Sequence, residues 1–103
     1  MERSFKITMH VPLGLRAGTL KFTQENSTVY GVMDILGCKS VFSGTLSPEG
    51  TANLEGFLNS VIRSFPFTAT GIIFASHLKL TIEDQRHPLY VTGDEIITQE
   101  ENY

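Results

Sequence analysis

The chain has no tryptophan, a single cysteine and no long run of uncharged apolar residues. One cysteine, Cys38, excludes an intrachain disulfide and a metal site built from cysteines alone. No apolar run approaches the length of a membrane span, and residues 1–6 lack the apolar core of a secretion signal. The sequence therefore predicts a cytoplasmic protein without a membrane partner.

Basic residues are not in excess, since the formal net charge of the 103-residue chain is -3. Nucleic-acid binding draws on counterion release and needs a net basic face, so we expect no nucleic-acid partner. The length fits one domain, and 41% hydrophobic residues is typical of a globular fold. We predict a single domain over residues 1–98 and an acidic tail over residues 99–103.

No segment shows the 3.6-residue period of a helix, whereas apolar and polar residues alternate along most of the chain. The clearest case is residues 64–74, where Phe67 and Ala69 share one parity and Thr68 and Thr70 share the other. This alternation is the signature of a strand with one buried face. The pattern predicts eight strands, at residues 5–11, 18–23, 29–33, 40–46, 52–58, 64–74, 77–83 and 88–97.

Short turns between eight strands predict an all-β, antiparallel up-and-down meander, which either closes into a barrel or folds over as a sandwich. Closure removes exposed edges, and Gly44, Gly56 and Ala69 at inward positions suit tight curvature. Pro66 argues against closure, because proline has no backbone N–H and a strand with a neighbour on each side needs its N–H groups for pairing. A proline is tolerated only at the beginning of such a strand or at a bulge. We predict a closed β-barrel built from four related hairpins.

Basic residues recur every 23 or 24 positions, at Arg16, Lys39, Arg63 and Arg86. Each is predicted to lie in the turn before an even-numbered strand. In an up-and-down topology alternate turns gather at opposite ends, so these four cations would share one end of the barrel. The other end would take the polar turns that carry Glu25 and Glu49.

Three of the four turns at the basic end are unusually apolar, with Leu13, Leu36 and Ile62 near their tips. These side chains could fold inward and plug the barrel, in which case their role is purely structural. They could instead form an interface with a second copy or another protein. They could also rim a pocket for an apolar ligand whose anionic group pairs with the four cations.

The residue types that carry catalysis or bind metals show no recognisable arrangement. His10 and His77 lie on strands with the parity opposite to the apolar residues, while His87 lies in a turn. Cys38 beside Lys39 could have a lowered thiol pKa, but a lone cysteine is more often a small apolar filler. We expect no metal, no cofactor and no enzymatic activity.

Four aromatic residues, Tyr30, Phe42, Phe67 and Tyr90, could form a stacking platform for single-stranded nucleic acid. They lack interleaved basic residues and repeat with the parity assigned to the core. We therefore predict that they are core side chains.

In strand count and meander the chain resembles the small up-and-down β-barrels of the lipocalin and avidin kind, the calycin-like barrels. The Gly-x-Trp motif of lipocalins and the biotin-box tryptophans of avidins are absent, because there is no tryptophan. No binding residue is therefore carried over, and the resemblance implies only a barrel that holds a small molecule.

Two functions follow from these patterns. The first is a non-catalytic binding domain for an apolar or anionic small molecule at the end that bears Arg16, Lys39, Arg63 and Arg86. The alternative is a protein–protein interaction or self-association module that uses the apolar turns at the same end.

Overall fold

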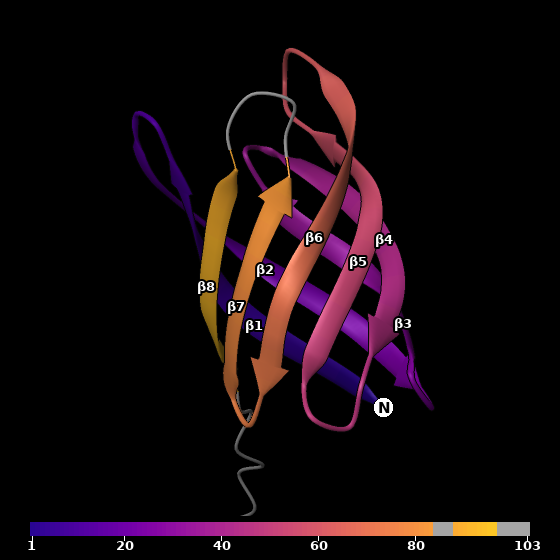
Figure 1. Ribbon diagram of the computed structural model, residues 1–103. Helices are drawn as coiled ribbons and strands as arrows, with labels where there is room; N and C mark the ends of the chain where they lie inside the picture. Colours follow the sequence, from indigo (N-terminus) through magenta and orange to yellow (C-terminus); the bar gives the residue numbers. More distant parts are fainter. Residues whose placement is uncertain (84–87, 97–103) are drawn as a thin grey trace, which may run out of the picture.

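A computed structural model describes residues 1–83 and 88–96, which form eight strands and no helix (Figure 1). The strands are β1 (Glu2–Val11), β2 (Gly14–Glu25), β3 (Thr28–Ile35), β4 (Cys38–Leu46), β5 (Thr51–Asn59), β6 (Ser64–Phe74), β7 (His77–Glu83) and β8 (Leu89–Glu95). Each pairs antiparallel with its neighbours in sequence, and β1 also pairs with β8, which closes the sheet. The predicted all-β closed barrel is confirmed and the sandwich is not formed. The end of the predicted domain and its tail, residues 97–103, lie outside the described residues.

The side-chain alternation of the strands determines what fills the barrel. On β6, Phe67 and Ala69 are buried while Thr68 and Thr70 are exposed, as the sequence pattern predicted. The same rule on the other strands yields 21 buried apolar side chains in one cluster, drawn from all eight strands. The interior of the barrel is therefore occupied by packed side chains.

The core prediction is wrong for two of the four aromatic residues. Phe42 and Phe67 are buried, whereas Tyr30 and Tyr90 lie on the outer face and are about half exposed. Each tyrosine directly follows a buried residue, Val29 or Leu89, and adjacent strand residues point to opposite faces. The tyrosines therefore occupy the outer parity.

Glycine permits a close approach between the backbones of neighbouring strands. A Cβ atom on Gly44 would fall on the Asn53 carbonyl oxygen, and one on Gly56 would fall on the Val41 carbonyl oxygen. No side chain fits between backbones this close, which is the use of inward glycines that the sequence suggested.

Pro66 does not conflict with closure of the barrel. It lies opposite Phe57 of β5 and is the third residue of β6, close to the beginning of the strand. A missing amide is tolerated at the beginning of a strand, which is the position that the sequence argument allowed for a proline. The barrel closes with Pro66 in place.

Candidate functional site

Two hairpins extend beyond the barrel wall at the same end of the molecule (Figure 1). In the first, β2 pairs with β1 from its first residue but with β3 only from Thr19. In the second, β6 pairs with β5 from its first residue, and its pairing with the described residues of β7 runs from Thr68 to Phe74. We call residues 10–18 the β1–β2 arm and residues 58–67 the β5–β6 arm.

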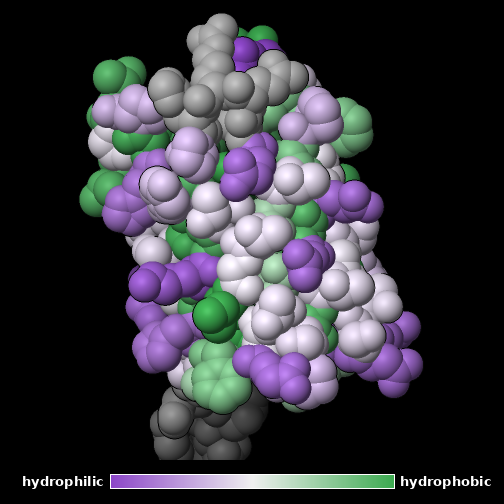
Figure 2. All heavy atoms as spheres, in the orientation of Figure 1, coloured by the Kyte–Doolittle hydropathy of each residue, from purple (hydrophilic) through white to green (hydrophobic). Residues whose placement is uncertain are grey.

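The tips of both arms expose apolar side chains. Leu13 is 88% exposed and Ile62 is 85% exposed, and their neighbours Leu15 and Val61 are also exposed. Figure 2 shows hydrophobic spheres gathered at the upper left, over the β1–β2 arm, whereas the front wall is mixed or polar. Two of the three predicted interface residues, Leu13 and Ile62, therefore face solvent.

The third, Leu36, lies in the turn between β3 and β4 and behaves differently. Its side chain is half-buried and packs against the core. Leu36 and Gly37 have φ angles of 60° and 79°, as in the two-residue type I′ turn of a hairpin. Positive φ is unusual for a bulky residue, so the packing of the Leu36 side chain offsets backbone strain. Leu36 thus helps to close this end of the barrel, as the plug interpretation describes.

The predicted positions of two cations are wrong, because Arg16 and Lys39 lie on strands and not in turns. Arg16 lies on the inner parity of β2, and its Nη1 donates to the Leu15 carbonyl oxygen at 3.0 Å. Lys39 lies on the outer parity of β4, opposite Asp34 of β3. The strands β2 and β4 begin earlier than the alternation alone indicated, and the two cations fall on different faces of the sheet.

Arg63 lies in the turn before β6, as predicted. Its guanidinium carbon is 4.9 Å from the centroid of the Phe65 ring, a cation–π contact with a partly buried ring that packs against the core. Arg86, the fourth predicted cation, lies outside the described residues.

Hydrogen bonds from side chains hold the β5–β6 arm against β4 where the ladder between β4 and β5 has stopped. The Asn59 backbone N–H donates to Ser40 Oγ at 2.8 Å, and Asn59 Nδ2 donates to the Lys39 carbonyl oxygen at 2.9 Å. Ser64 Oγ donates to Asn59 Oδ1 at 2.5 Å. Ser40 is fully buried, so without the hydrogen bond from Asn59 its hydroxyl oxygen would be a buried polar group that lacks a partner. The base of the arm is therefore fixed.

An ion pair closes the opposite end of the barrel. Arg3 Nη2 lies 2.9 Å from Glu95 Oε1, and the two side chains are only 18% and 22% exposed. The guanidinium lies 5.2 Å from the Phe5 ring centroid and 6.0 Å from that of Phe22, and it donates to the Ala75 carbonyl oxygen at 2.6 Å. The hydrogen bond from Arg3 lowers the pKa of the Glu95 carboxyl, against the opposing effect of burial.

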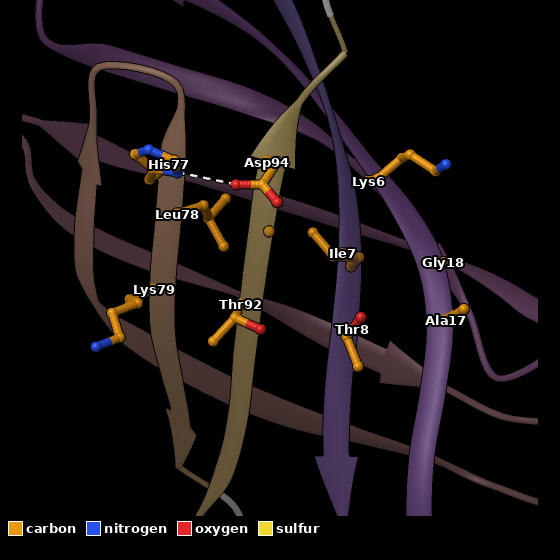
Figure 3. A pocket seen from close by; sticks show the side chains of 11 residues that line it. Lys6, Ile7, Thr8, Ala17, Gly18, His77, Leu78, Lys79, Thr92 and Asp94 are labelled. Carbon is orange, nitrogen blue, oxygen red and sulfur yellow. Dashed lines mark hydrogen bonds and ion pairs between the residues drawn. The ribbon is translucent and has the colours of Figure 1, made fainter.

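Asp94 and Glu95 point to opposite faces of β8, because adjacent residues of a strand alternate between its two faces. Asp94 Oδ1 lies 2.8 Å from His77 Nδ1 in an open groove of about 580 Å³ on the outer face of β7, β8, β1 and β2 (Figure 3). Lys6 and Lys79 flank this groove, but their ammonium groups point away from its centre. The His77–Asp94 pair is mostly exposed, and such pairs contribute little free energy.

Residue types capable of catalysis remain scattered. Cys38 is a half-buried free thiol at the start of β4, and His10 is exposed on β1. His87 lies outside the described residues. Among residues 1–83 and 88–96, no three His, Cys, Asp or Glu side chains are grouped so that they could hold a metal ion. In the same ranges, no helix is long and apolar enough to span a membrane.

Comparison with protein-family models, with curated proteins and with solved structures found no match. Fold and site together define the chain as a closed eight-stranded antiparallel barrel with a packed interior and two projecting hairpin arms. The arms, with their exposed apolar tips, are the candidate functional site.

Sequence reasoning missed Ser40, Asn59 and Arg3. Ser40 and Arg3 could have been found from the sequence, because each is a polar residue at a position with the parity of the buried residues on its strand. Asn59 carried none, since its partners come from other parts of the chain.

Proposed function

We propose that this chain is a non-catalytic interaction module that docks onto a protein through its β1–β2 and β5–β6 arms. The observation that carries this proposal is the exposure of Leu13 and Ile62 at the tips of the two arms, 88% and 85%. Apolar side chains gathered at one end of a soluble domain mark an interaction surface more often than apolar residues scattered singly.

The construction of the arms also supports docking. The hydrogen bonds of Ser40 and Asn59 hold the β5–β6 arm in place before a partner arrives, which reduces the entropy lost on binding. Arg16 and Arg63 lie beside the apolar tips. The surface is therefore suited to a partner with an apolar patch and nearby carboxylates.

Binding of an apolar or anionic small molecule at the same end stays a prediction. Since packed side chains occupy the interior, such a ligand would have to bind outside the mouth, between the arms. The cytoplasmic location also stays a prediction.

Photo-crosslinking tests the interaction module. A photoreactive amino acid replaces Leu13 or Ile62 in the full chain, in the cells that normally make it, and Thr70 on the barrel wall is the control site. We expect defined protein adducts from both arm positions and few from Thr70, which is exposed but lies on β6 away from the arms. Equal adduct yields at all three positions would contradict the proposal.

A further inference from the structure

Arg63 and Phe65, beside the tip of the β5–β6 arm, repeat a contact that Arg3 and Phe5 make at the opposite end of the barrel. In both pairs the arginine comes two residues before the phenylalanine. The guanidinium carbon lies 4.9 Å from the ring centroid in the Arg63–Phe65 pair and 5.2 Å in the Arg3–Phe5 pair. The chain therefore builds the same arginine–aromatic pair twice.

A carboxylate completes the Arg3–Phe5 pair. Arg3 Nε donates to Glu95 Oε2 at 3.1 Å, and Arg3 Nη2 donates to Glu95 Oε1 at 2.9 Å, so the guanidinium holds both carboxylate oxygens. This two-pronged geometry is the strong form of an arginine–carboxylate contact. The first pair thus identifies a carboxylate as the group that fits an arginine held over a phenylalanine ring.

The Arg63–Phe65 pair has no such carboxylate within the part of the chain that the structure describes. The Arg63 side chain is exposed, and the Phe65 ring has no oxygen that could accept its N–H groups. The N–H donors of Arg63 therefore lack the acceptor that Arg3 has.

We propose that Arg63 and Phe65 form a carboxylate-binding site, and that the carboxylate belongs to an acidic residue of the docked partner protein. The inference rests on the proposed function and adds the residue type that the partner presents at this arm. Arg63 directly follows the exposed Ile62, so a partner that covers the apolar tip also removes water from the guanidinium. A charge that loses its water without gaining a counter-charge is costly, so the partner has to supply one.

The distribution of charge along the chain agrees with an acidic partner. The two arms, residues 10–18 and 58–67, contain Arg16 and Arg63 and no acidic residue. The rest of the chain holds all 11 Asp and Glu residues and the other six of the eight Lys and Arg residues. Positive arms on a negatively charged protein attract and orient an acidic surface.

The backbone beneath the site is held in place. The Arg63 carbonyl oxygen accepts hydrogen bonds from the Ser60 backbone N–H at 2.8 Å and from Ser60 Oγ at 3.2 Å. Phe65 is partly buried and packs against the core. Both members of the pair are therefore positioned before a carboxylate arrives, which lowers the entropy cost of binding.

Nuclear magnetic resonance of the full chain tests the site with a defined probe. The probe is a short end-capped peptide of alternating glutamate and leucine, and the control peptide has glutamine in place of glutamate. We expect excess probe to shift the Arg63 Nε–H resonance and the control peptide to leave it unchanged. Arg3, which already holds Glu95, should respond to neither peptide. An unshifted Arg63 resonance, or an equal shift with the glutamine peptide, would overturn the inference.

Two arginine variants separate a specific contact from a general effect of charge. Arg63→Gln should weaken binding of the glutamate peptide about tenfold, because a hydrogen-bonded charge pair is lost. Arg16→Gln removes the same charge from the other arm and should weaken binding much less. Equal weakening by the two variants would mean that net charge alone attracts the peptide, which would overturn the site.

Thermal unfolding of the free chain tests whether the carboxylate comes from the partner. If a carboxylate of the same chain already held Arg63, Arg63→Gln would lower the melting temperature as much as Glu95→Gln does. We expect a smaller loss for Arg63→Gln, and equal losses would overturn the inference.

Photo-crosslinking from Ile62 separates this inference from the proposed function. In the Arg63→Gln background the yield of protein adducts should fall about tenfold, as expected for the loss of a charged hydrogen bond. An unchanged yield would show that Arg63 binds no carboxylate of the partner, although the arms still dock. Absence of arm-specific adducts from the unmodified chain would mean that the interaction module itself is wrong.

Discussion

Arg3 and Glu95 lie 92 positions apart in the chain and form an ion pair at 2.9 Å across the closing seam of the barrel. They belong to β1 and β8, the two strands whose pairing closes the sheet. The Arg3 guanidinium also covers the rings of Phe5 and Phe22. One side chain thus shields the core at this end and ties the first strand to the last.

Replacing Glu95 with Gln should lower the free energy of unfolding by about 1–3 kcal/mol at pH 7, because Arg3 loses a charged acceptor in a shielded site. Chemical denaturation measures the change. The control is Asp94→Asn, which removes the neighbouring carboxylate from a mostly exposed pair and should have almost no effect. Equal losses in the two variants would contradict a special role for Glu95.

The same pair predicts a pH dependence. The pKa of Glu95 lies below its ordinary value of 4.5 in the folded protein. A carboxyl with a lowered folded-state pKa stabilises the fold above its unfolded-state pKa, and this contribution disappears as the pH falls through the folded-state value. The stability difference between the unmodified chain and Glu95→Gln should therefore shrink on acidification below about pH 4.5. A difference that stays constant down to pH 2 would argue against this linkage.

Phe67→Ala should cost about 3–5 kcal/mol of unfolding free energy, because it removes a buried ring from the packed interior. Phe57 is the matched control, since it carries the same ring on the outer face of the adjacent strand. Phe57→Ala should cost less than about 1 kcal/mol. A loss below 1 kcal/mol for Phe67→Ala would show that the inner and outer faces of β6 are wrongly assigned.

At position 36 a glycine variant should be more stable than an alanine variant, which reverses the usual order of stability. Both substitutions lose the packing of the side chain, but only glycine also relieves the positive φ of 60° at this position. We expect Leu36→Gly to be more stable than Leu36→Ala by about 0.5–1 kcal/mol, measured by denaturant unfolding. An alanine variant as stable as the glycine variant would mean that the turn relaxes out of the left-handed conformation.

Ser40→Ala should loosen the β5–β6 arm more than it loosens the barrel. The substitution leaves the Asn59 backbone N–H without its acceptor, and a lost partner of this kind costs about 1–3 kcal/mol. Hydrogen exchange should therefore accelerate at the Asn59 amide far more than at the amides of Leu78 and Leu80 in β7. Uniform acceleration across the chain would indicate a global loss of stability and no specific anchor.

The barrel could be predicted from the sequence because alternation is local. Phe67 and Ala69 reveal the inner face of their strand without knowledge of any other strand. The arms could not be predicted, since a projecting hairpin appears only when the register of three strands is known, as at Thr19 of β2. The cation prediction failed for a related reason: equal spacing does not fix which face of the sheet a residue occupies, and Lys39 lies on the outer wall.

Native mass spectrometry of the protein purified from the cells that make it tests the central claim most directly, namely that the arms and not the interior of the barrel carry the function. We predict a dimer, or a complex with another protein, with no added small-molecule mass. A monomer with an added small mass that is lost on denaturation would contradict the claim and return the function to small-molecule binding.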